Sequence, residues 1–214
     1  SSQTKYFKNE GDTVYVVNTE PKKDGYEFKG WKFSEDNSTL TKGNSFTMPN
    51  HDVTLTANWA PVANTGYKVE YYYQSETDGT YPATADGAAQ RQGTTATTAS
   101  VTDADKVPTR TGYVFSDRNT WTVLSAEIAG DGSTTLKVYF ELRYNVTGEI
   151  DNGGIVTNGA QTVAWGGKSD EMNFTAADGY LISEITVNGK AQHVDYDQTS
   201  YEYPAMEAIK QDIH

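Results

Sequence analysis

Tyrosine is the residue type whose number and spacing most clearly suggest chemistry in this chain. The sequence has 15 tyrosines, and Tyr71, Tyr72 and Tyr73 are consecutive. Because side chains alternate between the two faces of a strand, such a run places rings on both faces, and Tyr72 is predicted to face solvent. An exposed tyrosine can stack on a sugar or anchor a partner, so we expect ligand contacts at Tyr72, Tyr196 and Tyr201. The alternative is that these rings only favour strand formation and cover their neighbours.

The titratable side chains do not form a pattern that is typical of catalysis. His51, His193 and His214 fall in a predicted turn, a predicted loop and the end of the chain, without metal-ligand spacing. Catalysis needs several such groups in one pocket, so we expect no enzyme, no catalytic residues and no cofactor. The segments Asp103–Asp105 and Asp195–Asp197 could contribute to a Ca²⁺ site, but neither has the glycine and distal glutamate of an EF-hand loop. We therefore expect no metal site and interpret both as polar surface loops.

The composition excludes several classes of chemistry and of partner. The chain has no cysteine and a formal net charge of −12, which excludes thiol nucleophiles and argues against binding to nucleic acid or to an anionic membrane. No apolar run approaches the roughly 20 residues that a membrane-spanning helix needs. An intramolecular Lys–Asn bond through Lys68 or Lys137 is a further possibility, but both lysines are predicted to point outward from their strands.

A short recurring phrase indicates which elements position the tyrosines. A polar residue and a glycine precede a tyrosine at Gly25-Tyr26, Gly112-Tyr113 and Gly179-Tyr180, and each phrase is predicted to be a turn that opens a strand. Phrases that recur in this way mark arrays of small modules, and frequent Thr, Val and Tyr favour strands. The predicted fold class is mainly β, with three tandem small modules, β-grasp-like or small β-sandwich, in an elongated array.

Alternating apolar patterns predict where the strands lie. A bulge near Gly30 is expected because the apolar phase changes there, one helical turn is expected within residues 101–107, and residues 83–100 give no clear pattern. A linker at residues 61–66 is expected to bend more than the junction at residue 143, where a strand crosses from one module to the next. The predicted strands include residues 13–17, 26–33, 53–59, 67–73, 134–140, 144–150, 162–165, 172–174 and 181–187.

The first module carries a specific resemblance. The phrase Gly-Tyr-x-Phe-x-Gly-Trp, a Met-Pro turn and a strand ending in tryptophan occur in order, through Gly25, Tyr26, Phe28, Gly30, Trp31, Met48, Pro49 and Trp59. Residues 11–59 thereby resemble the Listeria–Bacteroides repeat, also called the internalin B-repeat, although the family's opening strand is not evident. Gly112 and Tyr113 are similar to the same repeat class and to mucin-binding-protein repeats, and Gly179 and Tyr180 to other bacterial surface repeats. These resemblances imply β-grasp-like or small β-sandwich modules in secreted, multi-domain surface proteins of bacteria, with no shared catalytic residues.

We expect three domains. Residues 1–60 are an internalin-type repeat lacking its first strand, residues 66–143 a second β-grasp-like repeat, and residues 144–214 a third repeat truncated at its C-terminus. The expected function is a non-enzymatic stalk of an adhesin-like bacterial protein, outside the cell at its surface or wall, that spaces a distal domain from the wall. The alternatives are a module that binds host glycan or glycoprotein through exposed tyrosine, and an accessory domain of a secreted carbohydrate-active enzyme. Its other partners are neighbouring domains of a longer protein, and we expect a monomer unless open sheet edges pair.

Overall fold

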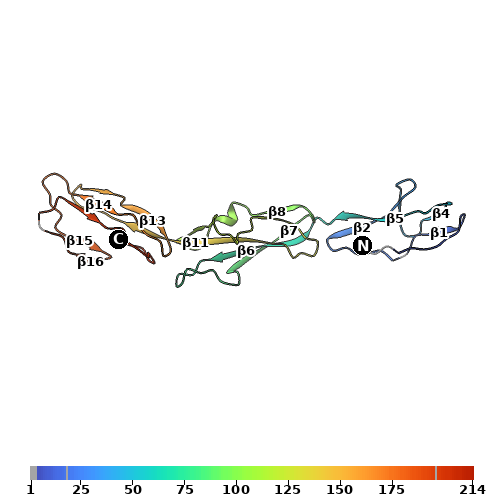
Figure 1. Cartoon of the computed structure of the whole chain (residues 1–214), viewed down its shortest axis with the longest axis horizontal. Helices are drawn as coiled ribbons and strands as arrows, with labels where there is room; N and C mark the ends of the chain where they lie inside the picture. Colours follow the sequence, from blue (N-terminus) through green and yellow to red (C-terminus); the bar gives the residue numbers. More distant parts are fainter. Residues whose placement is uncertain (1–3, 18, 196) are drawn as a thin grey trace. The chain divides into compact units, whose positions relative to one another are not determined.

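Short β-strands make up nearly all of the regular structure (Figure 1). The computed structural model describes residues 4–17, 19–195 and 197–214. Within these ranges the helical structure is one turn of 3₁₀-helix, η1 (Ala104–Lys106), in the segment where the sequence predicts a helical turn. The predicted mainly β fold is confirmed. The division into three modules and their β-grasp character stay predictions.

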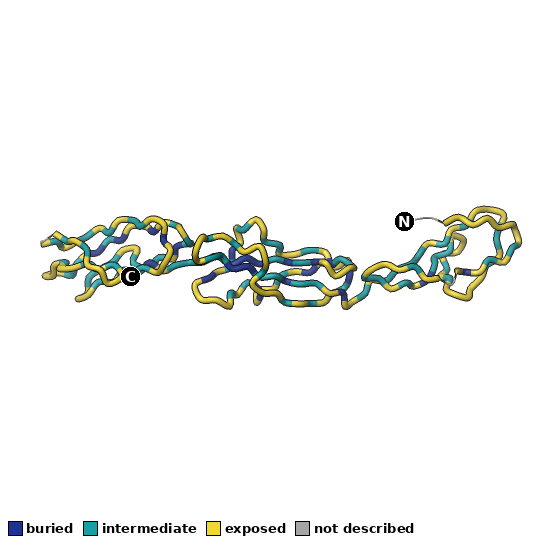
Figure 2. The backbone as a smooth tube through the Cα atoms, turned by 90° about the horizontal axis from the view of Figure 1, so that it is seen from below, coloured by how far each residue is buried: buried dark blue, intermediate teal, exposed yellow. Residues whose placement is uncertain are grey.

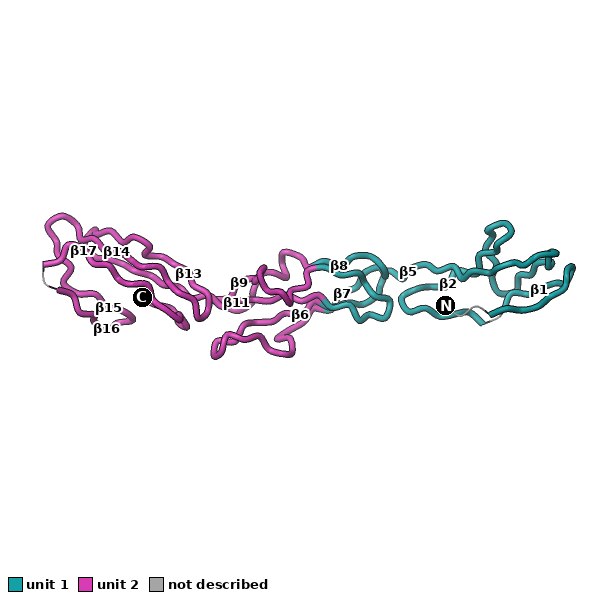
Figure 3. The backbone as a smooth tube through the Cα atoms, viewed as in Figure 1, with its two compact units in different colours: residues 1–68, 90–100, 125–135 teal, residues 69–89, 101–124, 136–214 magenta. Residues whose placement is uncertain are grey.

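The chain divides into two compact units (Figure 3). The first comprises residues 1–68, 90–100 and 125–135, and includes β1 (Thr13–Tyr15), β2 (Tyr26–Phe33), β3 (Thr39–Leu40), β4 (Ser45–Thr47), β5 (Leu55–Pro61), β8 (Thr98–Ser100) and β10 (Ser125–Glu127). The second comprises residues 69–89, 101–124 and 136–214, and includes β9 (Tyr113–Phe115), β12 (Ile155–Thr157), β13 (Ala160–Ala164), β14 (Met172–Thr175), β15 (Ile185–Val187), β16 (Lys190–Gln192) and β17 (Ser200–Tyr203). Three strands contribute residues to both units, namely β6 (Thr65–Tyr73), β7 (Gly87–Gly93) and β11 (Thr135–Thr147).

The first unit contains the sheet that carries the recurring phrase. Strands β3, β2 and β5 pair antiparallel in that order, and β1 pairs separately with β4. The register between β2 and β5 shifts between Phe28 and Gly30, which confirms the predicted bulge, and Gly30 has a φ of 107° that side-chain-bearing residues rarely adopt. The Phe28 ring then lies 5.4 Å from both Trp31 and Trp59, so the two tryptophans share one half-buried aromatic cluster.

The tyrosine-rich strand β6 lies inside a larger sheet. The strand order is β13–β11–β6–β7, and β9 also pairs with β11. Val69 of β6 and Leu136, Val138 and Phe140 of β11 are almost fully buried, and the dark blue stretches of Figure 2 mark where such buried residues lie along the chain. Strand β11 continues to Thr147, so one strand crosses residue 143 as the sequence predicts.

A second core in the second unit lies beyond residue 143. Strands β12, β14 and β17 form an antiparallel sheet in that order, and β15 pairs with β16. The buried residues of this core are Val146, Val163, Met172, Phe174 and Ile209. Because Val146 belongs to β11, one strand supplies side chains to two successive cores.

Two segments differ from the sequence-based expectation. The small, polar stretch of residues 83–100 contains β7 and β8; pairing with neighbouring strands forms them where their own residues give little strand preference. The third phrase makes the predicted turn, with Gly179 at a φ of 83°, but it opens no strand. Tyr180 and Leu181 are exposed, and the next strand begins at Ile185.

Candidate functional site

The prediction that Tyr72 faces solvent is wrong. Tyr72 is 5% exposed, its ring stacks on Tyr139 with centroids 4.6 Å apart, and its hydroxyl donates to the Glu70 carboxylate at 2.7 Å. Burial, together with Glu70, raises the pKa of Tyr72 to about 12. The adjacent Tyr73 is buried as well and stacks on Phe140, so both faces of β6 are covered here. Tyr72 therefore offers no surface to a ligand.

The two other candidate tyrosines have different outcomes. Tyr196 lies outside the described residues. Tyr201 is half-buried in β17, where it pairs opposite Phe174 of β14 and its ring lies 6.5 Å from that of Tyr203. A ligand contact at Tyr201 stays a prediction.

An exposed aromatic surface of the second unit is built around Trp121 instead. Trp121 is 60% exposed, and its ring lies 6.3 Å from Tyr81 and 6.0 Å from Tyr139. Tyr81 meets Tyr139 edge to face at 5.1 Å, and Tyr139 in turn stacks on the buried Tyr72. We call these four residues the aromatic platform: an exposed indole supported by a half-buried and two buried phenols.

Hydrogen bonds fix the loop that presents the exposed indole. The Asn119 side-chain oxygen accepts from the backbone N–H of Trp121 at 2.9 Å, and the Asn119 carbonyl oxygen accepts from that of Thr122 at 3.1 Å. Val123 exchanges two backbone hydrogen bonds with Lys137 of β11, at 3.0 and 2.9 Å. Sequence reasoning missed this site because Tyr81 and Trp121 are isolated aromatics in loops, without the alternation that marks a strand. An Asn two residues before a Trp, which is an Asx-turn signal, is the one local feature that could have indicated it.

The linker after the first sheet is held by a close backbone contact that we call the glycine junction. Gly25 and Gly130 lie so near one another that a Cβ on Gly130 would overlap the carbonyl oxygen of Asp24, and a Cβ on Gly25 would overlap Gly130. The linker itself is tied on both sides: the Val62 N–H donates to the Gly25 oxygen at 2.8 Å, and the Thr95 N–H donates to the Val62 oxygen at 2.9 Å. Only glycine permits such an approach of two backbones.

A buried hydroxyl pair reinforces the glycine junction. The side-chain oxygens of Thr65 and Thr95 are 2.6 Å apart, and the two residues are 8% and 2% exposed. One hydroxyl donates a hydrogen bond and the other accepts it, so neither buried oxygen lacks a partner. A buried polar group without a partner would be destabilising. The linker predicted at residues 61–66 is shorter in the structure, because Pro61 belongs to β5 and Thr65 and Gly66 belong to β6. The remaining turn at residues 62–64 is held through both backbone groups of Val62.

A single large side chain lies across the crossing at residue 143, in what we call the tryptophan junction. Trp165, just after β13, packs on Gly79 so closely that a Cβ there would overlap the indole. The indole N–H donates to the Glu76 carbonyl oxygen at 2.9 Å, and the Trp165 backbone N–H donates to the Leu142 oxygen at 3.1 Å. The Lys210 ammonium lies 4.6 Å from the ring centroid. Trp165 thus joins the turn after β6 to the end of β13 and to Lys210.

Gln74 ties that turn to β11 as well. Its side-chain nitrogen donates to the Gly79 carbonyl oxygen at 2.8 Å, and its side-chain oxygen accepts from the Leu142 N–H at 2.9 Å. Gln74 also connects to the second recurring phrase, because its carbonyl oxygen accepts from the Tyr113 hydroxyl at 2.9 Å. Gly112, in the same phrase, has a φ of 82°. These phrase residues have structural roles in the second unit.

The Met-Pro turn of the first module is structural too. The Met48 N–H donates to the Asp12 oxygen, and the Met48 oxygen accepts from the Gly11 N–H, both at 2.9 Å. Pro49 follows and is half-buried. The turn therefore connects the segment before β1 with the end of β4.

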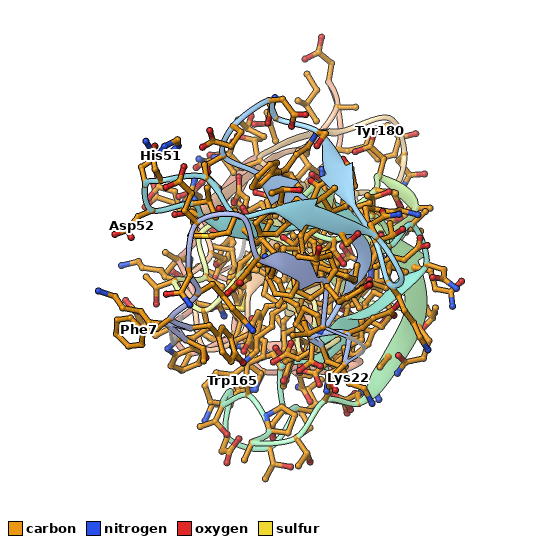
Figure 4. All side chains as sticks on the ribbon, turned by 90° about the vertical axis from the view of Figure 1, so that its right-hand side faces the viewer. Phe7, Lys22, His51, Asp52, Trp165 and Tyr180 are labelled. Carbon is orange, nitrogen blue, oxygen red and sulfur yellow. The ribbon has the colours of Figure 1, made fainter. Side chains whose placement is uncertain are left out.

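His51 and the carboxylates of Asp103 and Asp105 have different surroundings. His51 lies in an exposed turn, where one ring nitrogen is 2.9 Å from Glu35, and Figure 4 shows its side chain projecting outward. Asp105 is buried and accepts from the Tyr71 hydroxyl at 2.6 Å, whereas Asp103 is exposed, so their carboxylates face different surroundings. Across the described ranges, no group of three or more His, Cys, Asp or Glu residues could hold a metal ion. Nor does any described helix have the length and apolar character needed to cross a bilayer.

An open hollow of about 370 Å³ lies beside β6 and is lined by Tyr73, Gln74, Arg110 and Tyr113, among others. Its one strong cation is already engaged, because Arg110 donates to Asp86 at 2.7 Å and stacks over Tyr73 at 4.2 Å. With Arg110 and Asp86 paired, the carboxylate of Glu76 gives the lining of the hollow a net negative charge.

Comparison with known families places the first module. Residues 2–63 match the family described as the divergent InlB B-repeat domain, which confirms the internalin-type repeat inferred from the recurring phrase. No curated protein and no solved structure matches the chain.

Proposed function

We propose that this chain is a non-enzymatic spacer in an extracellular protein of a bacterial cell, which holds a distal domain away from the cell wall. Its N-terminal part is a repeat of the InlB type, a kind of repeat that belongs to bacterial surface proteins. In this role the chain needs neither a catalytic group nor a cofactor, and its partners are the domains before and after it.

The observation that carries the proposal is the construction of the two junctions. A spacer holds a distal domain at a defined distance only if the linkers between its modules are rigid. A flexible linker lets that distance vary. At the glycine junction, backbone hydrogen bonds and a glycine contact fix the linker on both sides. At the tryptophan junction, one continuous strand supplies side chains to two successive cores, and one indole is bonded to the turn after β6.

A display assay tests the proposal directly. The chain is placed between a cell-wall anchor and a folded reporter on a Gram-positive cell, and accessibility of the reporter to an antibody-coated bead is measured. A flexible Gly/Ser chain of the same 214 residues, with a root-mean-square span of only about 80 Å, is the matched control. We expect the reporter to be captured with the native spacer and captured less with the flexible chain. Equal capture with both would contradict the spacer function.

A further inference from the structure

We infer that the aromatic platform around Trp121 is a binding site for a neutral carbohydrate, in which a pyranose ring stacks on the exposed indole face. This goes beyond spacing, because it gives the second unit a ligand of its own. It also moves the site from Tyr72, where the sequence predicts it, to a loop that lies over the same stack of rings.

The exposure of Trp121 is the first step of the argument. A tryptophan in a small domain normally adds most of its area to the core, yet Trp121 is 60% exposed while the tyrosines beneath it are half-buried or buried. An exposed indole that is held rigid by neighbours loses little conformational freedom when a ligand stacks on it. Both conditions are met here, since Asn119 fixes the backbone and Tyr81 and Tyr139 support the ring.

The size of the platform favours a small ligand over a protein. A stable protein interface buries about 800 Å² on each partner, whereas one aromatic side chain buries about 150–250 Å². The described platform offers one exposed indole and the partly exposed ring of Tyr81. That area suits one or two sugar rings.

Polar groups beside the indole suit the hydroxyls of a sugar. Asn119 and Tyr81 are half-buried beside the indole, and the Asn119 side chain lies within hydrogen-bond reach of the Tyr81 hydroxyl. Ser116 is 5% exposed and its hydroxyl donates to Glu141 at 3.2 Å, so it supports these groups from below. Sugar hydroxyls both donate and accept, so amide, hydroxyl and carboxylate groups can each pair with them.

The surrounding charge selects against an anionic sugar. Glu70 accepts a hydrogen bond from the Tyr72 hydroxyl. Burial is the main cause that raises the pKa of Tyr139 and of Tyr81. The charge of Glu70 raises the pKa of Tyr139 further, and the charge of Glu141 does so for Tyr81. Glu141 is also paired with Arg143, and the Lys137 ammonium lies 5.9 Å from the Tyr72 ring centroid. The negative field at the platform therefore comes mainly from the net charge of −12 of the whole chain. A sialylated or sulfated glycan would be repelled, so the ligand class is a neutral oligosaccharide.

Titration of the intact chain with soluble hexaoses tests the inference. The probes are neutral gluco-, manno-, galacto- and N-acetylglucosamine oligomers, and a hyaluronan oligomer is the anionic comparison. Binding of each probe is measured by calorimetry and by tryptophan fluorescence. We expect saturable binding of at least one neutral probe with a change in fluorescence. Trp121→Ala should weaken it by about tenfold or more, since loss of one stacking platform is an effect of that size. Tyr180→Ala, which removes another exposed aromatic (Figure 4), should bind as the native chain does.

Several outcomes would overturn the inference. These are silence of every neutral probe in the millimolar range, equal binding by Trp121→Ala, or binding of the hyaluronan oligomer alone. A further outcome is that the immobilised chain captures a glycoprotein and still captures it after its glycans are removed enzymatically. That result would indicate a protein partner instead. Because Trp121 is exposed, its replacement should leave the thermal midpoint unchanged, and a matching midpoint separates a lost site from a lost fold.

Discussion

The glycine junction and the tryptophan junction connect successive parts of the chain by different physical means. At the first, two backbones touch because Gly25 and Gly130 have no side chains, and any added atom overlaps backbone. At the second, one large side chain, Trp165, packs on the turn after β6. The first junction should therefore be sensitive to added volume and the second to removed volume. Each can be broken without touching the other.

The largest effect is expected from Gly130→Ala. Gly130 is not among the residues with positive φ, so alanine fits its backbone conformation, and the cost comes from the overlap with Asp24. We expect a loss of about 3 kcal/mol in the free energy of unfolding, the upper end for overpacking, measured by urea denaturation. Gly66→Ala is the matched control, because a Cβ at Gly66 meets nothing within 4 Å. Equal stability of the two variants would show that the close contact does not hold the junction.

Removal of the indole should have the next largest effect. Trp165→Ala loses the packing on Gly79, the hydrogen bond to Glu76 and the contact with Lys210. Because Trp165 is only half-buried, we expect about 2 kcal/mol, below the range for a fully buried tryptophan. Trp165→Phe keeps a ring but no N–H, and should lose about 1 kcal/mol. A phenylalanine variant as unstable as the alanine variant would assign the junction to the hydrogen bond and not to packing.

The buried hydroxyl pair gives a smaller effect that sharpens the account of the glycine junction. Thr95→Val keeps the shape but leaves the Thr65 hydroxyl, 2.6 Å from its partner in the native chain, without its bond. We expect a loss of about 1–2 kcal/mol for the single change and a smaller loss for Thr65→Val with Thr95→Val, since removing both partners is nearly neutral. Additive losses in the double-mutant cycle would mean that the two hydroxyls do not interact.

The smallest effect is a change in pH dependence at the platform. The pKa of Tyr72 is about 12 in the folded chain, above its ordinary value of 10.0, so the folded state favours the protonated phenol. That contribution to stability is complete below pH 10 and is lost as pH rises towards 12. Tyr72→Phe should therefore lose less stability over that interval than the native chain, while burial of Tyr139 retains part of the fall. A steeper fall in the variant would contradict the assignment.

Local pattern predicted much of the fold but little of the site. The strand through residue 143 follows from the alternation of apolar and polar residues, and the bulge at Gly30 follows from a change of phase in that alternation. Both signals depend on neighbouring residues alone. The contact of Gly25 with Gly130 and the packing of Trp165 on Gly79 depend on chain folding over long separations. No local signal carries such contacts.

The error at Tyr72 has the same origin. Alternation indicates two faces for β6 but cannot show that Tyr139 of a distant strand covers the outer one. Conversely, no apolar alternation surrounds Trp121 in the sequence. Its exposed position next to Tyr81 depends on how β6, β11 and the loop after β9 come together.

The central claim is that both junctions keep a fixed geometry in solution. The chain has no cysteine, so pairs of introduced cysteines carry spin labels without interference: Lys42→Cys with Ser133→Cys within the first unit, and Thr84→Cys with Glu184→Cys within the second, all at exposed positions. Distances between the labels are measured by double electron–electron resonance. We predict one narrow distance distribution for each pair, with only the first pair broadened by Gly130→Ala and only the second by Trp165→Ala. Broad distributions in the native chain, or variants that change neither pair, would contradict the account.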